Sequence, residues 1–159
     1  TLSNGDNAML KDIKPDQLPC TVAVIMDRVA ESRLLEDFDL DFALSNAHAS
    51  MEAGTGAVFV DNDVDPTCVL WVVKSRGFFF KHYSAFVILI TTLTDTREGS
   101  EPVRKAMAML KIAEDWGRNN GCKSVTVSSW INEGGPDITP LLERWGARLQ
   151  EKTHVKAIT

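Results

Sequence analysis

The 159-residue sequence has few of the residues on which zinc-binding and disulfide-stabilised proteins depend. It contains three cysteines, three histidines and one tyrosine. Cys20, Cys68 and Cys122 are odd in number and far apart, and they form no Cys-x-x-Cys or Cys/His spacing, which argues against a zinc site or a disulfide framework. We therefore expect no metal, and buried free thiols in a reducing compartment.

Long hydrophobic runs and a positive net charge are also missing. The longest apolar run, residues 85–90, is far shorter than the ~20 residues that cross a bilayer, and the polar N-terminal residues do not resemble a signal peptide. The sequence therefore predicts a cytoplasmic protein with no membrane partner. A net charge of −5 argues against a nucleic-acid partner, because such a protein needs a cationic surface.

What is present is the composition of a globular domain. The chain is 44% hydrophobic and 25% charged, and its length fits one domain with a sizeable core. Residues 1–10 are predicted to be a flexible lead and residues 11–159 a single domain.

Apolar spacing predicts helices first and strands next. Residues 16–33 have the period of one helical face, with Pro19 in the first turn, and residues 40–53 predict a second helix with Asp39 as N-cap. Strands are predicted at residues 57–61, at residues 69–73 and within residues 78–93. The last of these is apolar on both faces, so we expect it to be central and covered by helices on either side.

The last third predicts alternating helices and strands. A helix begins at about residue 101, a strand covers residues 124–130, a short helix lies near residues 140–146, and a closing strand lies near residues 154–158. The fold class is therefore α/β, with a mixed sheet flanked by helices on both faces.

This order of elements resembles the GNAT (general N-acetyltransferase) superfamily. Residues 109–125, Met-Leu-Lys-Ile-Ala-Glu-Asp-Trp-Gly-Arg-Asn-Asn-Gly-Cys-Lys-Ser-Val, are similar to the family's third helix and its exit into the fifth strand. Residues 141–147, Leu-Leu-Glu-Arg-Trp-Gly-Ala, are similar to its Leu-Tyr-Glu-Lys-x-Gly-Phe segment. The two-helix opening, Phe38-Asp39 and the Ala-Glu-Asp-Trp of residues 113–116 resemble GNAT-like proteins of tailed bacteriophages in particular. The resemblance implies that acyl-CoA lies where the central strand separates from its neighbour.

The resemblance also implies a phosphate-binding turn of small residues at the start of the third helix. The matching positions are residues 101–106, of which only Ala106 fits, because Pro102 lacks an N–H and Glu101 is negative. The alternative is an exposed loop with Ser100 as N-cap. The residues that could still form an irregular anion site are Arg97, Gly99, Arg104 and Lys105.

The family's catalytic residues are replaced. The tyrosine that protonates the CoA thiolate in many members corresponds to Leu142, which has no proton to donate. The strand that often carries a general-base glutamate has no carboxylate here. His82 and Tyr83, at the start of that strand, are the nearest titratable pair, and the alternative for His82 is an ordinary polar residue at a strand end beside Lys81.

Two further groups suggest recognition of a partner. Successive strand residues point to opposite faces, so we expect at least one of three phenylalanines to leave the core and mark a protein-binding patch, unless helices cover both faces. They are Phe78, Phe79 and Phe80. An acidic run could attract a cationic amine or simply form a solvated turn. Its members are Glu36, Asp37, Asp39 and Asp41.

The departures from the family motifs favour a GNAT-fold, phage-type protein that is a non-catalytic binding or structural component. We expect a protein partner, with a virion as one candidate location, and self-association stays open. The alternative is an acetyl-CoA-dependent N-acetyltransferase with a nonstandard phosphate loop and a water as proton relay. Acetyl-CoA is expected to bind only under this alternative.

Overall fold

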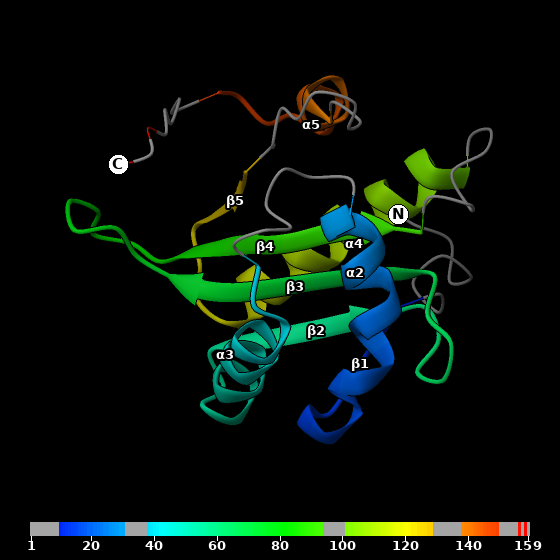
Figure 1. Cartoon of the computed structure of the whole chain (residues 1–159). Coiled ribbons are helices and arrows are strands. Elements are labelled where there is room, and N and C mark those ends of the chain that lie inside the picture. The colour runs from blue at the N-terminus through cyan, green and yellow to red at the C-terminus, as the bar shows by residue number, and fades with distance from the viewer. Residues whose placement is uncertain are drawn as a thin grey trace.

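The computed structural model describes residues 10–30, 38–93, 101–128, 138–149, 156 and 158. In these residues a five-stranded sheet has the order β1-β2-β3-β4-β5 and carries helices on both faces (Figure 1). Neighbouring strands are antiparallel except β4 and β5, which are parallel. The predicted α/β class with a mixed sheet is confirmed.

The elements follow one another in the predicted order. They are β1 (Lys11–Asp12), the 3₁₀-helix η1 (Pro15–Thr21), α2 (Val22–Ala30), α3 (Leu40–Glu52), β2 (Gly56–Val60), β3 (Cys68–Ser75), β4 (Ser84–Thr92), α4 (Glu101–Asn119), β5 (Ser124–Val127) and α5 (Thr139–Trp145). The closing strand expected near residues 154–158 lies outside the described residues, except for Lys156 and Ile158, which belong to no strand.

The first predicted helix has two parts, which corrects the expectation for Pro19. Pro19 lies inside η1, not in the first turn of an α-helix. Because proline has no N–H and its ring crowds the carbonyl four residues earlier, α-helical bonding to Pro15 is not available here. The tighter 3₁₀ turn continues to Thr21, whose hydroxyl donates to the Leu18 carbonyl at 2.7 Å, and α2 begins at Val22.

The ends of α3 agree with the sequence pattern. Asp39 Oδ1 accepts a hydrogen bond from the N–H of Phe42 at 2.9 Å, which is the predicted N-cap. The helix ends at Glu52, and Gly54 then adopts a φ of +72°, a conformation that favours glycine.

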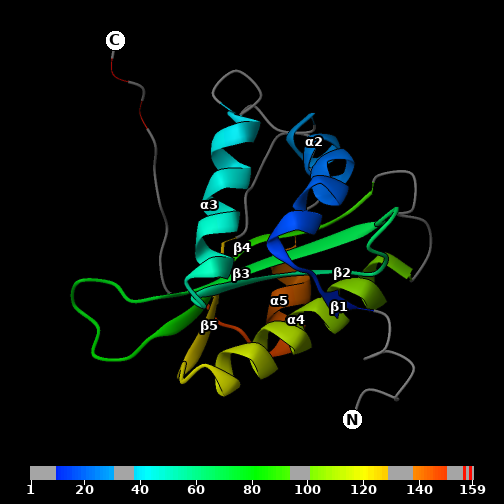
Figure 2. The same ribbon diagram turned by 90° about the horizontal axis from the view of Figure 1, so that it is seen from below.

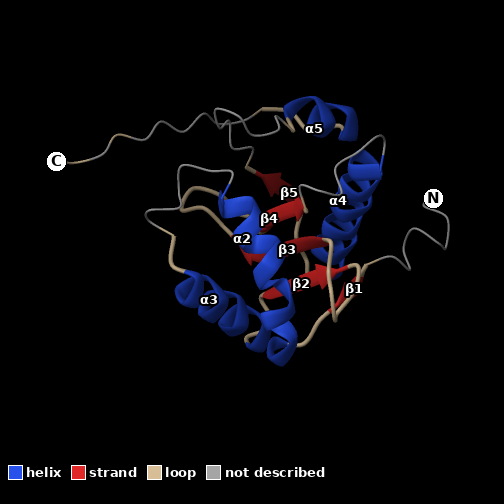
Figure 3. Cartoon of the chain, turned by 45° about the vertical axis from the view of Figure 1, so that its right-hand side comes forward, coloured by secondary structure: helices blue, strands red, loops and turns tan. Residues whose placement is uncertain are grey.

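The two faces of the sheet pack against different helices (Figures 2 and 3). α2 and α3 cover one face, where the cluster includes Val24, Ala47 and Val69. α4 covers the other face, where the cluster includes Leu70 and Met109. α5 lies beside α4, and Trp145 Nε1–H donates to Glu114 Oε2 of α4 at 3.1 Å. The part of the chain that the structure describes has no helix with the length and apolarity of a membrane span.

The three cysteines are free thiols. Cys68 is buried at the start of β3, and burial, together with the nearby charge of Asp61, raises the pKa of its thiol to about 12. Burial also raises the pKa values of the half-buried Cys20 and Cys122 thiols. The protonated thiol is a weak nucleophile, so Cys68 is a packing residue.

Candidate functional site

β4 and β5 separate halfway along the sheet. They pair over only four registers, from Ser84 with Ser124 to Val87 with Val127. β4 then continues to Thr92, whereas β5 ends at Val127. Among the described residues, no strand lies beside β4 on this side beyond Val87. The edge of β4 from Ile88 onward therefore borders an opening in the sheet.

A β-bulge lies at the same point. Trp71 of β3 pairs with Leu89 and Val72 pairs with Val87, so the ladder passes over Ile88. The Ile88 side chain is 49% exposed, although its neighbour Val87 is buried. A bulge leaves its extra residue outside the hydrogen-bond ladder and redirects its side chain, and bulges are frequent beside active sites.

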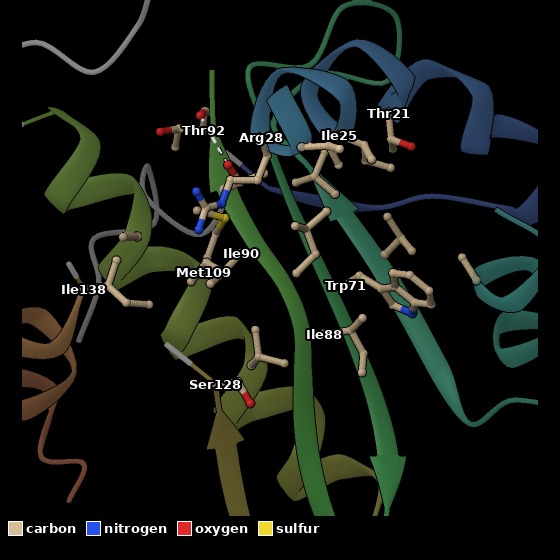
Figure 4. A pocket seen from close by; sticks show the side chains of 18 of the residues that line it. Thr21, Ile25, Arg28, Trp71, Ile88, Ile90, Thr92, Met109, Ser128 and Ile138 are labelled. Atoms are coloured by element: carbon tan, nitrogen blue, oxygen red, sulfur yellow. Dashed lines mark hydrogen bonds between the residues drawn. The ribbon is translucent and has the colours of Figure 1, made fainter. Parts of the chain in front are cut away.

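A cavity of about 470 Å³ occupies this opening (Figure 4). We call its two walls the α2–α3 side and the α4–α5 side. The first includes Ile25, Arg28, Leu44, Ala47 and Trp71, and the second includes Ala106, Met109, Ser128, Ile138 and Leu142. Both walls are mainly apolar, so the cavity suits a ligand that is largely apolar and makes few polar contacts.

Few polar side chains line the cavity. Arg28 extends from the last turn of α2 toward Ile90 and Met109 (Figure 4). Trp71 Nε1 is the one buried side-chain nitrogen or oxygen in the described residues that lacks a hydrogen-bond partner. Ser128 follows β5 and is exposed at the opening. The described lining contains no Asp, Glu, His or Tyr.

Two of the four residues predicted for an anion site contact separate partners. Arg104 Nη2 lies 2.8 Å from Glu101 Oε1, and the hydrogen bonds from Arg104 lower the pKa of that carboxyl. Lys105 Nζ donates to Thr67 Oγ1, at the start of β3, at 2.8 Å. Neither cation lines the cavity. The other residues of the predicted loop, Arg97, Gly99 and Ser100, lie outside the described residues.

His82 and Tyr83 lie at the base of the β3–β4 hairpin and do not line the cavity. The Tyr83 ring stacks with two cations, since Lys74 Nζ is 4.6 Å and Arg76 Cζ is 5.0 Å from its centroid. Leu142, at the position of the family's tyrosine, is buried and gives the cavity an apolar surface.

The three phenylalanines lie in the turn of the β3–β4 hairpin, which projects beyond the sheet (Figures 1 and 2). Phe78, Phe79 and Phe80 are 105%, 97% and 68% exposed. The expected exposure is observed, but the alternation argument behind it is wrong, because β4 begins only at Ser84. Their role in binding a partner stays a prediction.

The expected acidic rim is described only in part. Asp39 is used as the N-cap of α3, Asp41 is exposed in the first turn, and Glu36 and Asp37 lie outside the described residues. Within the described ranges, no three His, Cys, Asp or Glu side chains gather as metal ligands would.

Sequence reasoning did not identify the polar residues of the cavity. Arg28 could have been found, because Thr21, Ile25 and Arg28 are spaced four and then three residues apart and share a helical face. Trp71 and Ser128 lie in ordinary strand sequence. The sequence does not predict the bulge at Ile88, because the residues around it have the pattern of a continuous apolar strand.

Several acetyltransferases of known structure are similar to this chain in overall fold. An acetyltransferase from Trypanosoma brucei is 14% identical, with a TM-score of 0.65 over 94% of this chain and 98% of its own. Glucosamine-6-phosphate N-acetyltransferase from Arabidopsis thaliana is 8% identical, with a TM-score of 0.65 over 94% and 97%. AAC(6')-Iy, solved with the bisubstrate analogue CoA-S-monomethyl-acetylneamine, is 14% identical, with a TM-score of 0.67 over 94% and 97%.

These similarities define the fold of this chain as that of the GNAT acetyltransferases. By sequence, no protein-family model matches the chain, and no curated protein is significantly similar to it. The fold and its structural neighbours give no information on a phage origin or a place in a virion, which stay predictions.

Proposed function

We propose that this protein is an acyl-CoA-dependent N-acyltransferase, with acetyl-CoA as the donor. The observation that carries the proposal is the apolar cavity at the bulged edge of β4, where β5 has separated. The cavity reaches side chains from both faces of the sheet, so two substrates could approach one edge from opposite sides. The similarity in fold to acetyltransferases supports the same function.

The α4–α5 side of the cavity fits the pantetheine arm of a CoA ester. That arm is extended and carries amide groups, and the edge of β4 beyond Val87 can pair with such a chain as with an added strand. Ala106 and Met109 offer it an apolar wall. The start of α4 favours an anion through its helix dipole, and Arg104 already offsets the charge of Glu101 there.

The α2–α3 side is then the site of the amine. When bound, the CoA ester supplies an activated acyl carbon. The amine nitrogen bonds to that carbon as the carbon–sulfur bond breaks, and the proton that the nitrogen loses ends on the sulfur. Ser128 places a hydroxyl at the opening, so the proton can pass through this hydroxyl or through water. Arg28 of α2 lines the α2–α3 side, where its N–H groups can orient ligand oxygens.

The test is acetyl transfer from acetyl-CoA to a panel of primary amines, followed by mass spectrometry of the acetylated product. Ala106→Glu puts an unpaired carboxylate into the cavity, so we expect kcat/KM to fall by about tenfold or more. Ala49→Glu makes the same change on the exposed surface of α3, and we expect a change of less than about twofold. Ala106→Leu fills the same space without charge and should also reduce transfer.

Loss of transfer in the Ala49→Glu variant alone, or undiminished transfer in both Ala106 variants, would contradict this location of the site. Circular dichroism and thermal unfolding of each variant check that the loss of transfer is not a loss of fold.

A second function, recognition of a protein partner, is favoured by one observation. The tip of a projecting hairpin exposes three large apolar side chains, those of Phe78, Phe79 and Phe80. Such side chains gathered on a surface usually mark an interaction site. The tip lies outside the cavity lining, so partner binding and acyl transfer can occur in the same molecule.

A further inference from the structure

The turn between β3 and β4 stands clear of the rest of the sheet. The last pair of the hairpin ladder joins Ser75 to Ser84. The neighbouring strands begin near the same level, because β2 begins opposite Val73 and β5 begins opposite Ser84. Residues 76–83 therefore extend beyond both neighbours, as Figures 1 and 2 show.

The tip of this turn is apolar. Phe78 and Phe79 are fully exposed, and Phe80 is mostly exposed. The N–H of Phe80 donates to the carbonyl of Gly77 at 3.2 Å, and a Cβ at position 77 would come within 2.8 Å of Cδ2 of Phe80. Glycine thus lets the turn close tightly under the ring. Because the three phenylalanines are consecutive in a turn and all exposed, their rings project to more than one side.

Cations surround the base of the hairpin. Residues 66–94 contain no Asp or Glu, although the chain has 22 of them. Three cations belong to the hairpin, and a fourth lies just before β5, where its backbone N–H donates to the carbonyl of Tyr83 at 2.9 Å. None of the four forms an ion pair with a described residue. We call these residues the basic collar: Lys74, Arg76, Lys81 and Lys123.

The order of groups along the hairpin matches the order of layers at the surface of a lipid bilayer. Lys81 directly follows the phenylalanines and Arg76 precedes them by two residues, so at about 3.3 Å per residue these cations lie roughly 3–7 Å behind the tip. Protein segments at a bilayer surface bury apolar side chains by about 5–10 Å in the boundary between head groups and acyl chains. At that depth the basic collar meets the head groups, which are negative in an anionic bilayer.

A bilayer also suits the shape of the tip. A fluid acyl layer accepts rings that project to several sides, whereas a protein would have to enclose the tip in a matching cleft. Stable attachment to a bilayer takes two signals, such as an apolar group and a basic patch, and the hairpin carries both. The expectation of no membrane partner rests on the lack of a spanning run, and attachment to a surface needs no such run.

We propose that the tip of the β3–β4 hairpin binds the surface of an anionic lipid bilayer, with the three phenylalanines in the acyl boundary and the basic collar at the head groups. The cavity beside β4 stays open in this arrangement, because no residue of the range 74–83 lines it. The inference is independent of the proposed function, since attachment to a bilayer needs neither acyl-CoA nor an amine.

The first test is sedimentation with sucrose-loaded vesicles, made either of phosphatidylcholine alone or of an equimolar mixture with phosphatidylserine. We expect the wild type to bind the anionic vesicles more tightly by about tenfold or more, because each basic residue near such a surface adds about fivefold. Phe79→Ser should weaken this binding by about tenfold, the effect of losing one buried aromatic side chain. Phe42→Ser is the matched control, the same change at an exposed phenylalanine of α3, and should leave binding unchanged.

The basic collar is tested by reversing one charge. Lys81→Glu should weaken binding to the anionic vesicles by about tenfold or more and leave binding to the neutral vesicles unchanged. Lys14→Glu makes the same change at an exposed lysine before η1. Because salt screens charges that are farther away than about 10 Å, this control should change the affinity by less than about twofold.

The second test detects insertion into the bilayer. Phe79→Trp keeps an aromatic ring at the tip and adds a fluorophore there, and lipids brominated on their acyl chains quench tryptophans that they contact. We expect these lipids to quench Phe79→Trp more than the wild type, because residues 76–83 contain none of the four native tryptophans. Phe42→Trp should be quenched no more than the wild type.

The inference is overturned if the wild type does not bind anionic vesicles at millimolar lipid, a result that would leave a protein as the partner of the tip. It is equally overturned if Phe79→Ser or Lys81→Glu binds as tightly as the wild type, or if brominated lipids quench Phe79→Trp and Phe42→Trp alike. Thermal unfolding of each variant checks that a weaker affinity is not a loss of fold.

Discussion

Asp61 connects the turn after β2 to the N-terminal part of α4. Its Oδ1 accepts the N–H groups of Thr67 at 2.8 Å and Cys68 at 3.2 Å. Its Oδ2 accepts the Thr67 hydroxyl, whose oxygen accepts from Lys105 Nζ at 2.8 Å. Burial alone would raise the pKa of Asp61, but these hydrogen bonds outweigh burial and lower it. Lys105 is thus held at the sheet instead of at the cavity.

We predict that Asp61→Ala destabilises the fold by about 2 kcal/mol at neutral pH, the value of hydrogen bonds to a charged group. A carboxyl with a lowered pKa stabilises the fold above its ordinary value of 3.8, and this contribution is lost as the pH falls through the lowered value. The difference in the free energy of unfolding between wild type and Asp61→Ala should therefore become smaller below about pH 4. Urea unfolding at several pH values measures it.

Asp65→Ala is the matched control, because Asp65 is an exposed acid in the same turn and, among the described residues, its carboxylate forms no hydrogen bond or ion pair with α4. We expect it to change the free energy of unfolding by less than about 0.5 kcal/mol. An equal loss of unfolding free energy in the two variants would show that the connection to α4 does not stabilise the fold. A loss in Asp61→Ala that is unchanged at pH 3 would show the same.

Local chemistry decided which single residues were predictable. Asp39 was found as an N-cap because a cap depends only on its own turn. The sequence groups Arg104 and Lys105 as an anion site because they are adjacent. Adjacent helical residues point in different directions, however, so Arg104 contacts Glu101 and Lys105 contacts Thr67. Trp71 could not be singled out, because its lack of a partner is a property of the packed structure.

At the level of elements, the β3–β4 hairpin carries its apolar side chains away from the core. Gly77 and Phe80 close the turn through a backbone hydrogen bond of 3.2 Å, and Lys74 and Arg76 flank Tyr83 at its base. The exposed phenylalanines therefore contribute little to folding and remain available for contact with another molecule.

We predict that Phe79→Ser changes the free energy of unfolding by less than about 0.5 kcal/mol, because the side chain is 97% exposed. The same change should weaken retention on a hydrophobic-interaction column. Phe59→Ser is the control: Phe59 packs against the core, so its loss should cost about 3 kcal/mol. If Phe79→Ser lowered the free energy of unfolding nearly as much as Phe59→Ser does, the hairpin tip would have to be packed against the rest of the protein.

Element order was predictable because it depends on apolar periodicity, and the strands and helices observed follow it closely. Element ends were less predictable. The strand expected over residues 124–130 is observed as Ser124–Val127, Ser128 is not part of it, and residues 129 and 130 lie outside the described residues. Where a strand leaves its neighbour depends on the packing of α4 and α5, not on its own residues, so the opening beside β4 could not be read from the sequence.

At the level of the whole molecule, the cavity changes the balance between the two predicted functions. The non-catalytic prediction rested on the residues at positions 101–106 and on Leu142. Yet the opening beside β4 and its bulge are present in the position where the resemblance places acyl-CoA. The fold is shared with several acetyltransferases, which supports the enzyme alternative. Substrate binding at this opening, and not the presence of one motif, is the property that decides between them.

Calorimetric titration of the wild-type protein with acetyl-CoA tests this account most directly. We predict one binding site per chain, with an affinity that Ala106→Glu weakens and Ala49→Glu does not. At one hundred times the dissociation constant, acetyl-CoA should stabilise the fold by about 2.7 kcal/mol, which a thermal shift measures independently. No heat of binding and no thermal shift at millimolar acetyl-CoA would contradict the account.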